Sequence, residues 1–269
     1  MPTDIKTVNS YNKYALQWAE RIRSKRNLAH EYLEKPAMKK LLPDIKGKRV
    51  LCIGCGTGEE CQYILKKGAK SVMGIDISKK VIDIARKSFK KIEFKLMDME
   101  KLDFSQSSFD VVYSSLALHY LKDWRAIFSE INRVLVPNGY FLFSTHHPVY
   151  WSSKKIKKNG FKKVQLGFQT SDNLNSVKFM GDYFSIRKIK DIWFNELEVS
   201  YYNKPFSEII NEIVASRFSI RCCLEPKAVD SAKKVDNKFY KIHNRIPIFI
   251  IFLLQKSGRS DQIRNIKDR

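Results

Sequence analysis

The stretch that decides the fold is Val50-Leu51-Cys52-Ile53-Gly54-Cys55-Gly56-Thr57-Gly58-Glu59-Glu60. It starts as an apolar run typical of a buried strand, passes through glycines at alternate positions, and continues into a helical pattern. Alternating glycines let the backbone turn sharply and approach a ligand closely, and they leave amide groups free at the start of a helix. The stretch therefore predicts a ligand-binding turn between a strand and a helix.

The spacing of these glycines argues against one common kind of ligand. A dinucleotide-binding fingerprint has its third glycine at the position that Glu59 occupies here. A glutamate at the start of the helix would also repel a pyrophosphate where the helix dipole attracts one. We therefore expect a cationic or zwitterionic ligand rather than a nucleotide diphosphate.

Two further strands of the predicted sheet end in a carboxylate. Asp76 closes the strand Val72-Met73-Gly74-Ile75-Asp76, where a carboxylate can accept both hydroxyl hydrogens of a ribose. Asp98 closes the next strand between two methionines, and it can accept a hydrogen bond from an adenine amino group while the methionines contact the ring. The structural alternatives are a helix cap for Asp76 and simple loop placement for Asp98.

Strand and helix patterns alternate around this segment. The strands are expected at 49–53, 71–76, 92–97, 109–115 and 140–145, and the helices between them at 59–67, 79–89 and 124–134, with Pro137-Asn138-Gly139 as a turn. Two helices are expected before the first strand, and a helix at 206–216 with strands at 218–224 and 246–254 would complete the sheet. Repeated βαβ units with short connections imply a parallel sheet covered by helices on both faces.

The alternation stops after His147-Pro148, where lysines and then aromatic residues become frequent. We therefore predict an N-terminal helical lid (1–45), a ligand-binding core (46–148), a substrate-side insertion (149–204), a C-terminal part of the core sheet (205–256) and a basic tail (257–269). Tyr14 and Trp18 of the lid, together with Tyr183 and Trp193 of the insertion, are expected to face the substrate. Helix packing without substrate contact and a solvated loop are the alternatives.

The runs 49–58, 74–78, 97–99, 109–120 and 133–140 resemble, motif by motif and in order, the core of class I (Rossmann-like) S-adenosylmethionine-dependent methyltransferases. The flanking runs 34–38 and 41–43 are similar to members of the bacterial small-molecule type. The resemblance implies an α/β three-layer sandwich with a mostly parallel seven-stranded sheet of order 3-2-1-4-5-7-6, in which strand 7 is antiparallel. It also implies S-adenosylmethionine as cofactor, held by Gly54, Gly56, Gly58, Asp76, Ile77, Asp98, Met99 and Ser114. One departure is Cys52, which stands where the family usually has an acidic residue, and Glu59 could compensate for it.

Methyl transfer from a sulfonium is an in-line substitution, so aligning the acceptor and excluding water are the main tasks of such an enzyme. Where an acceptor needs a base, His119 after the fourth strand and His146 after the fifth are the candidates, and simple packing is the alternative for each. No metal site is expected, because the histidines have no acidic cluster beside them. Cys52, Cys55 and Cys61 should also be unable to converge as a zinc site.

Composition limits the remaining possibilities. The longest apolar stretch, Ile246 to Leu254, is too short to span a bilayer, and the N-terminus lacks the apolar core of a secretory signal, so we expect a cytoplasmic protein without a membrane partner. The net charge of +22 could attract nucleic acid, although lysines are spread along the whole chain.

Three functions are compatible with these features. The first is methylation of an O or N atom of a small molecule or small peptide. The second is an RNA methyltransferase, which is weakened because Ser114-Ser115-Leu116-Ala117 stands where many base-methylating enzymes have an Asn-Pro-Pro-Tyr type motif. The third is a catalytically silent protein that uses the fold to bind nucleic acid or a partner. The oligomeric state is left open.

Overall fold

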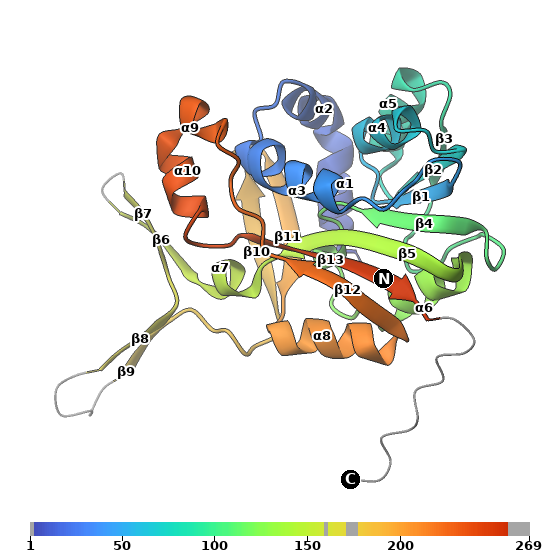
Figure 1. Ribbon diagram of the computed structural model, residues 1–269. Coiled ribbons are helices and arrows are strands. Elements are labelled where there is room, and N and C mark those ends of the chain that lie inside the picture. The colour runs from blue at the N-terminus through green and yellow to red at the C-terminus, as the bar shows by residue number, and fades with distance from the viewer. Residues whose placement is uncertain (1–2, 159–160, 171–176, 258–269) are drawn as a thin grey trace, which may run out of the picture.

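A seven-stranded sheet runs through the centre of the structure, a computed structural model that describes residues 3–158, 161–170 and 177–257 (Figure 1). Its order is β12-β13-β5-β4-β1-β2-β3. The strands are β1 (Arg49–Ile53), β2 (Ser71–Asp76), β3 (Glu93–Leu96), β4 (Phe109–Ser114), β5 (Leu135–His146), β12 (Phe218–Leu224) and β13 (Phe249–Lys256). Strands β1 to β5 are parallel, whereas β13 runs antiparallel to both of its neighbours. The predicted order 3-2-1-4-5-7-6 is therefore confirmed, with β13 as the antiparallel strand 7.

Helices cover both faces of this sheet (Figure 1). One face carries α3 (Lys35–Leu41), α4 (Glu59–Lys66) and α5 (Lys79–Ser88), and the other carries α6 (Arg125–Val134) and α8 (Phe206–Ala215). Successive side chains of a strand point to opposite faces. Accordingly Val50 and Cys52 of β1 pack toward α4, while Leu51 and Ile53 pack toward α6. The apolar run that the sequence shows before the glycines is thus a strand buried on both faces.

The N-terminal segment contains more helix than expected. It forms α1 (Ile5–Lys13), α2 (Ala15–Arg23) and a π-helical turn, His30–Glu34, that continues into α3. Pro36 has no backbone N–H to donate to the carbonyl of Tyr32, and that carbonyl accepts a hydrogen bond from the amide of Val229 instead (2.9 Å). The proline explains why the turn is wider than an α-helix and why it contacts a distant segment.

Helix α1 is fixed to the core through one side chain. Asn12 Oδ1 accepts hydrogen bonds from Ser78 Oγ (3.0 Å) and from the amide of Lys80 (2.9 Å), at the start of α5. It therefore satisfies an amide that has no partner inside the helix, as a helix cap does. This contact holds α1 beside the carboxyl ends of β2 and β3.

The insertion consists of α7 and three antiparallel hairpins. Its elements are α7 (Pro148–Ser152), β6 (Lys154–Lys158), β7 (Phe161–Gln165), β8 (Gly167–Thr170), β9 (Val177–Met180), β10 (Arg187–Trp193) and β11 (Leu197–Asn203). Hairpins β6–β7 and β8–β9 extend away from the body of the molecule (Figure 1). Hairpin β10–β11 packs on α1, where the amide of Ser200 donates a hydrogen bond to Thr7 Oγ1 (2.8 Å). Hairpin β10–β11 helps to enclose the central cavity, and Lys155 of β6 also lines it.

Two boundaries differ from the prediction. Strand β5 begins at Leu135, so the predicted turn at 137–139 is a bulge inside the strand: Phe109 pairs with Leu135, and Val111 pairs with Tyr140. Strand β13 begins at Phe249 and follows two short helices that were not predicted, α9 (Ala232–Val235) and α10 (Asn237–His243). The predicted basic tail lies outside the described residues, apart from residue 257. No described helix has the length and apolar character needed to cross a membrane.

Candidate functional site

A cavity of about 610 Å³ opens at the carboxyl ends of β1 to β5, and the glycine loop between β1 and α4 lies against it. Gly56 (φ +53°) faces this space, since a Cβ added to it would meet only Trp18 Nε1, at 3.9 Å. Gly58 (φ +93°) does not line the cavity, because a Cβ there would lie 2.8 Å from Phe94 and 2.9 Å from Phe89. Gly56 thus allows close approach of a ligand, whereas Gly58 is required by packing and backbone conformation.

Asp76 holds the glycine loop in place from the end of β2. Its Oδ2 accepts a hydrogen bond from the amide of Gly56 (3.0 Å), and its Oδ1 accepts one from the amide of Ser78 (2.9 Å). Burial raises the pKa of this carboxyl group above its usual value. A carboxylate has about four acceptor positions, so Asp76 keeps capacity for hydroxyl groups of a ligand in the cavity that it lines together with Ile77.

The end of β3 contributes a second polar group with apolar neighbours. Met97, Asp98 and Met99 all line the cavity. Asp98 Oδ1 accepts a hydrogen bond from the amide of Glu100 (3.0 Å), and the amide of Met97 donates one to the carbonyl of Asp76 (3.0 Å). The two carboxylates predicted at strand ends, Asp76 after β2 and Asp98 after β3, therefore both lie at one edge of the cavity.

Stacked rings form the opposite wall. The His119 and His146 rings lie 3.7 Å apart at an angle of 11°, and His146 stacks in the same way on Trp151 (3.8 Å, 11°). Burial lowers the pKa of His119 to about 3. Burial, with smaller contributions from His119 and Lys155, lowers the pKa of His146 well below its usual value. Both nitrogens of His119 and Nδ1 of His146 are buried without a hydrogen-bond partner among the described residues. The wall thus contains neutral imidazoles whose hydrogen-bonding capacity is not used by the described residues.

Two segments close the cavity over these walls. Tyr11 of α1 and Tyr120, in the 3₁₀ turn Leu118–Tyr120, share a hydrogen bond between their hydroxyl groups (2.6 Å). Trp18 of α2 packs edge-on against Tyr11, with ring centroids 5.5 Å apart, and Trp193 of β10 lines the cavity from the insertion. Trp18 and Trp193, which the sequence analysis expects to face the substrate, both line this cavity.

Three other predicted site residues do not line this cavity. Tyr14 lies at the junction of α1 and α2 and packs in the apolar cluster formed with Leu197 and Val199 of β11. The hydroxyl of Tyr183 accepts a hydrogen bond from the amide of Phe206 (3.2 Å), so it serves the start of α8. Ser114 is fully buried inside the sheet. The interpretation of Tyr14 and Tyr183 as substrate-side residues is corrected by this packing.

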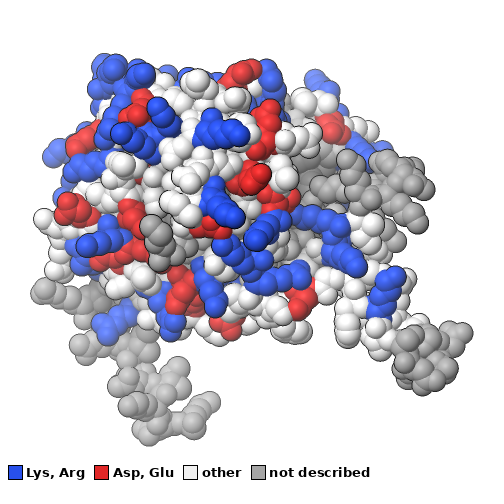
Figure 2. All heavy atoms as spheres, turned by 180° about the vertical axis from the view of Figure 1, so that it is seen from behind, with Lys and Arg blue, Asp and Glu red and all other residues white. Residues whose placement is uncertain are grey.

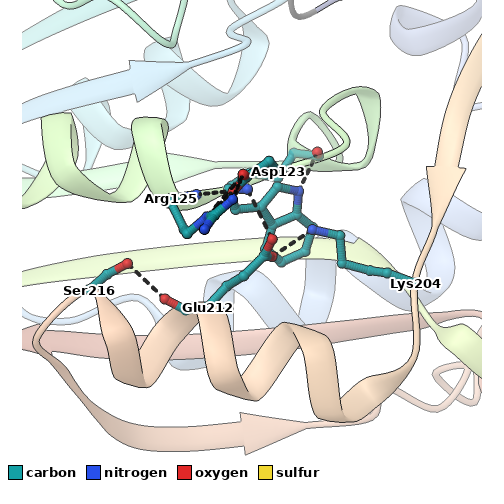
Figure 3. Close-up of polar contacts among 7 residues, drawn as sticks. Asp123, Arg125, Lys204, Glu212 and Ser216 are labelled. Atoms are coloured by element: carbon teal, nitrogen blue, oxygen red, sulfur yellow. Dashed lines mark hydrogen bonds and ion pairs between the residues drawn. The ribbon is translucent and has the colours of Figure 1, made fainter. Parts of the chain in front are cut away.

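The 3₁₀ turn that carries His119 is held by a buried ion pair (Figure 3). Lys204 Nζ lies 2.5 Å from Glu212 Oε2 and 4.3 Å from the centroid of the Trp124 ring. The amide of Trp124 donates to Glu212 Oε1 (3.2 Å), and its indole N–H donates to the carbonyl of Leu118 (2.9 Å). The junction of the insertion with α8 is thereby coupled to the wall of the cavity.

The three cysteines near the glycine loop, Cys52, Cys55 and Cys61, affect one another's pKa values. The Cys61 thiol is within hydrogen-bonding reach of Cys52 and Cys55, and these contacts lower its pKa. The pKa of Cys52 is raised, chiefly by its contact with Cys61, and that of Cys55 chiefly by burial. Within the described ranges, however, no group of three His, Cys, Asp or Glu side chains is arranged to hold a metal ion.

Comparison with known proteins gives consistent matches. A family model described as a methyltransferase domain matches residues 51–143. The chain is 34% identical to an uncharacterized protein of Haemophilus influenzae, over 82% of this chain and 87% of that protein. It is 30% identical to a malonyl-[acyl-carrier protein] O-methyltransferase of Hamiltonella defensa, over 70% of this chain and 72% of that enzyme. Its structure resembles that of an S-adenosylmethionine dependent methyltransferase from Mesorhizobium loti, with a TM-score of 0.68, 28% identity and coverage of 83% and 97%.

Proposed function

Because the chain belongs to the S-adenosylmethionine-dependent methyltransferases, we propose that it methylates an oxygen or nitrogen atom of a small molecule bound between the lid and the β10–β11 hairpin. When bound, S-adenosylmethionine supplies a methyl group on a positively charged sulfur, which becomes neutral as the methyl bonds to the acceptor. The described residues fit this cofactor: Gly56 leaves room for close approach, and Asp76 lines the cavity with acceptor capacity to spare. Asp98 and its flanking methionines suit an adenine ring.

The stack of His119, His146 and Trp151 is the observation that carries the proposal. A neutral imidazole with a free nitrogen accepts a hydrogen bond from an O–H or N–H group, and this orients a lone pair of the acceptor atom toward the methyl group. A pKa of about 3 makes His119 a weak base, because general bases work best with a pKa near the operating pH. Its role is therefore to align the acceptor rather than to take its proton completely.

The shape of the acceptor side favours a small molecule with a flat or apolar body. Aromatic rings from the lid, the insertion and the core surround it, including Tyr11, Trp18, Tyr120, Trp151 and Trp193. The volume of the whole cavity falls in the range of small-molecule sites. The name of the Hamiltonella defensa relative supports an oxygen atom as the acceptor.

The distribution of charge favours a small molecule over RNA. Figure 2 shows that, on the face seen from behind, Lys and Arg side chains are spread widely and interleaved with Asp and Glu side chains. Nucleic-acid-binding faces concentrate their positive charge in a patch or stripe. Positive charge is thus dispersed on this face, and methylation of RNA is treated as an alternative outcome of the test below.

The test is transfer of isotopically labelled methyl groups. The protein is incubated with labelled S-adenosylmethionine and, in parallel, with sets of small carboxylic acids, phenols and amines and with total cellular RNA. We expect label in a small molecule, and Asp76→Ala should abolish the transfer while Asp83→Ala, which changes a carboxylate on the outer part of α5, should preserve it. Label recovered in RNA alone would overturn the proposal.

A further inference from the structure

A pair of carboxylates with an imidazole between them lies beside the glycine loop. Glu34 is fully buried, and its Oε1 accepts hydrogen bonds from Ser115 Oγ (2.8 Å) and Ser144 Oγ (2.6 Å). Its Oε2 lies 3.4 Å from His30 Nε2, and Glu60 Oε1 lies 3.4 Å from the same nitrogen. His30, Glu60 and Ser115 line the cavity, so the cluster faces the ligand space and is separate from the acceptor wall.

This cluster has a deficit of positive charge. Glu34 Oε2 and Glu60 Oε1 accept no hydrogen bond within the described part of the chain, and a single N–H of His30 cannot serve both. Two carboxylates and one neutral imidazole carry a net charge of −2, and the net charge is still −1 when one of the three groups takes up an additional proton. Among the described residues, neither glutamate forms an ion pair with a lysine or an arginine. Because a buried charge is costly unless it is paired, a cation entering from the cavity would be bound strongly here.

The position of the cluster identifies which cation this is. In the sheet order, β2 and β3 lie on one side of β1, and β4 and β5 lie on the other. Asp76 and Asp98 follow β2 and β3, whereas the serines that bind Glu34 belong to β5 and to the residue after β4. A ligand whose nucleoside lies over β2 and β3 therefore extends across the end of β1 toward Glu60.

We propose that Glu60, supported by His30 and Glu34, binds the ammonium group of the methionine part of S-adenosylmethionine. The charge on this group matches the deficit of the cluster, and an ammonium can donate to the partly exposed carboxylate of Glu60. This inference concerns the cofactor, which the family shares, and it does not depend on the identity of the methyl acceptor. It also goes beyond the sequence, where Glu59 was the residue expected to compensate for Cys52.

The neighbouring Glu59 is already engaged. Its Oε1 accepts a hydrogen bond from Arg23 Nε (2.8 Å), and its Oε2 accepts one from Thr57 Oγ1 (2.5 Å). Its negative charge is thus paired with a guanidinium group, while Glu60 has no such partner among the described residues. His30 and Glu34 belong to the π-helical turn, a distortion that is frequent at functional sites.

Calorimetry with two ligands tests the assignment. S-adenosylhomocysteine keeps the ammonium group, whereas methylthioadenosine keeps the nucleoside and sulfur without the amino acid. We expect Glu60→Gln to lower the affinity for S-adenosylhomocysteine by roughly tenfold or more, as the loss of one charge-assisted hydrogen bond implies. The affinity for methylthioadenosine should change by less than about twofold. Glu31→Gln is the matched control, since Glu31 lies in the same turn but pairs with Lys35 outside the cavity.

Two outcomes would overturn the assignment. If Glu60→Gln weakens both ligands equally, Glu60 acts on the shape of the glycine loop and does not bind the ammonium. If it changes neither, the ammonium lies elsewhere. A folded Glu34→Gln variant should also lose affinity for S-adenosylhomocysteine and keep its affinity for methylthioadenosine. If the Glu34→Gln variant does not fold, the result for Glu60→Gln alone decides between the outcomes. Label transfer to a small molecule together with an unchanged affinity in Glu60→Gln would sustain the proposed function and reject only this subsite.

Discussion

The neutral state of His119 predicts how the stability of the protein depends on pH. Its pKa is about 3 in the folded protein and about 6.5 in an unfolded chain. Below pH 6.5 the unfolded chain therefore takes up a proton that the folded protein does not, so this contribution to stability is complete above pH 6.5 and is lost as the pH falls toward 3. Each pH unit costs about 1.4 kcal/mol, which gives about 2 kcal/mol between pH 7 and pH 5.

The substitution His119→Phe isolates this contribution. It keeps a ring in the stack with His146 and removes the proton site, and no hydrogen bond is lost because both nitrogens are without a partner among the described residues. Urea unfolding at pH 7 and pH 5 gives the stability loss of each protein, and contributions from carboxylates cancel in the comparison. The wild type should lose about 2 kcal/mol more than the variant. Equal losses would refute the assignment of His119 as a buried neutral imidazole.

Three further predictions concern the loop, the buried ion pair and the cofactor. Gly58→Ala should destabilise the protein by about 2 kcal/mol or more in thermal unfolding, because the added Cβ meets two phenylalanine rings. The control Gly47→Ala, at a similar φ but in open space, should cost only about 1 kcal/mol. Equal costs for the two variants would contradict the packing argument. Lys204→Met should lower the free energy of unfolding by about 3–5 kcal/mol in urea, since it leaves Glu212 buried without its cation. Adding Glu212→Gln to this variant should restore part of the lost stability. A double variant no more stable than Lys204→Met would contradict a charge effect. Asp76→Ala should lower the affinity for S-adenosylhomocysteine by at least about tenfold in calorimetry, because it releases the glycine loop and removes a hydrogen-bond acceptor. An unchanged affinity would mean that the ribose binds elsewhere.

The part of the fold that the sequence predicts is the part governed by local patterns. The strand that precedes the glycines is apolar at every position from Val50 to Ile53, and positive φ angles are found at Gly54, Gly56 and Gly58, as a tight turn requires. The order of the strands came from the family resemblance, because periodicity alone shows only that a parallel sheet exists. The start of β5 was misplaced because pairing with β4 continues across a bulge that looks like a turn in the sequence.

The part of the site that the sequence does not predict depends on contacts between distant segments. Glu34 meets Ser115 and Ser144, which are 81 and 110 residues away in the chain, and no local pattern marks such a meeting. The available signals were the spacing of His30 and Glu34 on one helical face and the second acid after the glycines. Tyr183 was misinterpreted for a related reason, since an aromatic residue in an insertion can serve a backbone amide as well as a substrate.

The cavity is assembled from two kinds of chain segment, and this has a consequence for how such an enzyme diversifies. The glycine loop and the two strand-end acids lie within one short continuous run, Cys52 to Met99, whereas the opposite wall combines the N-terminal helices, the ends of β4 and β5 and the β10–β11 hairpin. Mutations in the hairpin can remodel the pocket for the acceptor while every residue of the continuous run stays unchanged. The choice of acceptor can therefore evolve separately from the use of the methyl donor, and exchanging 149–204 between relatives is the natural engineering route to new acceptors.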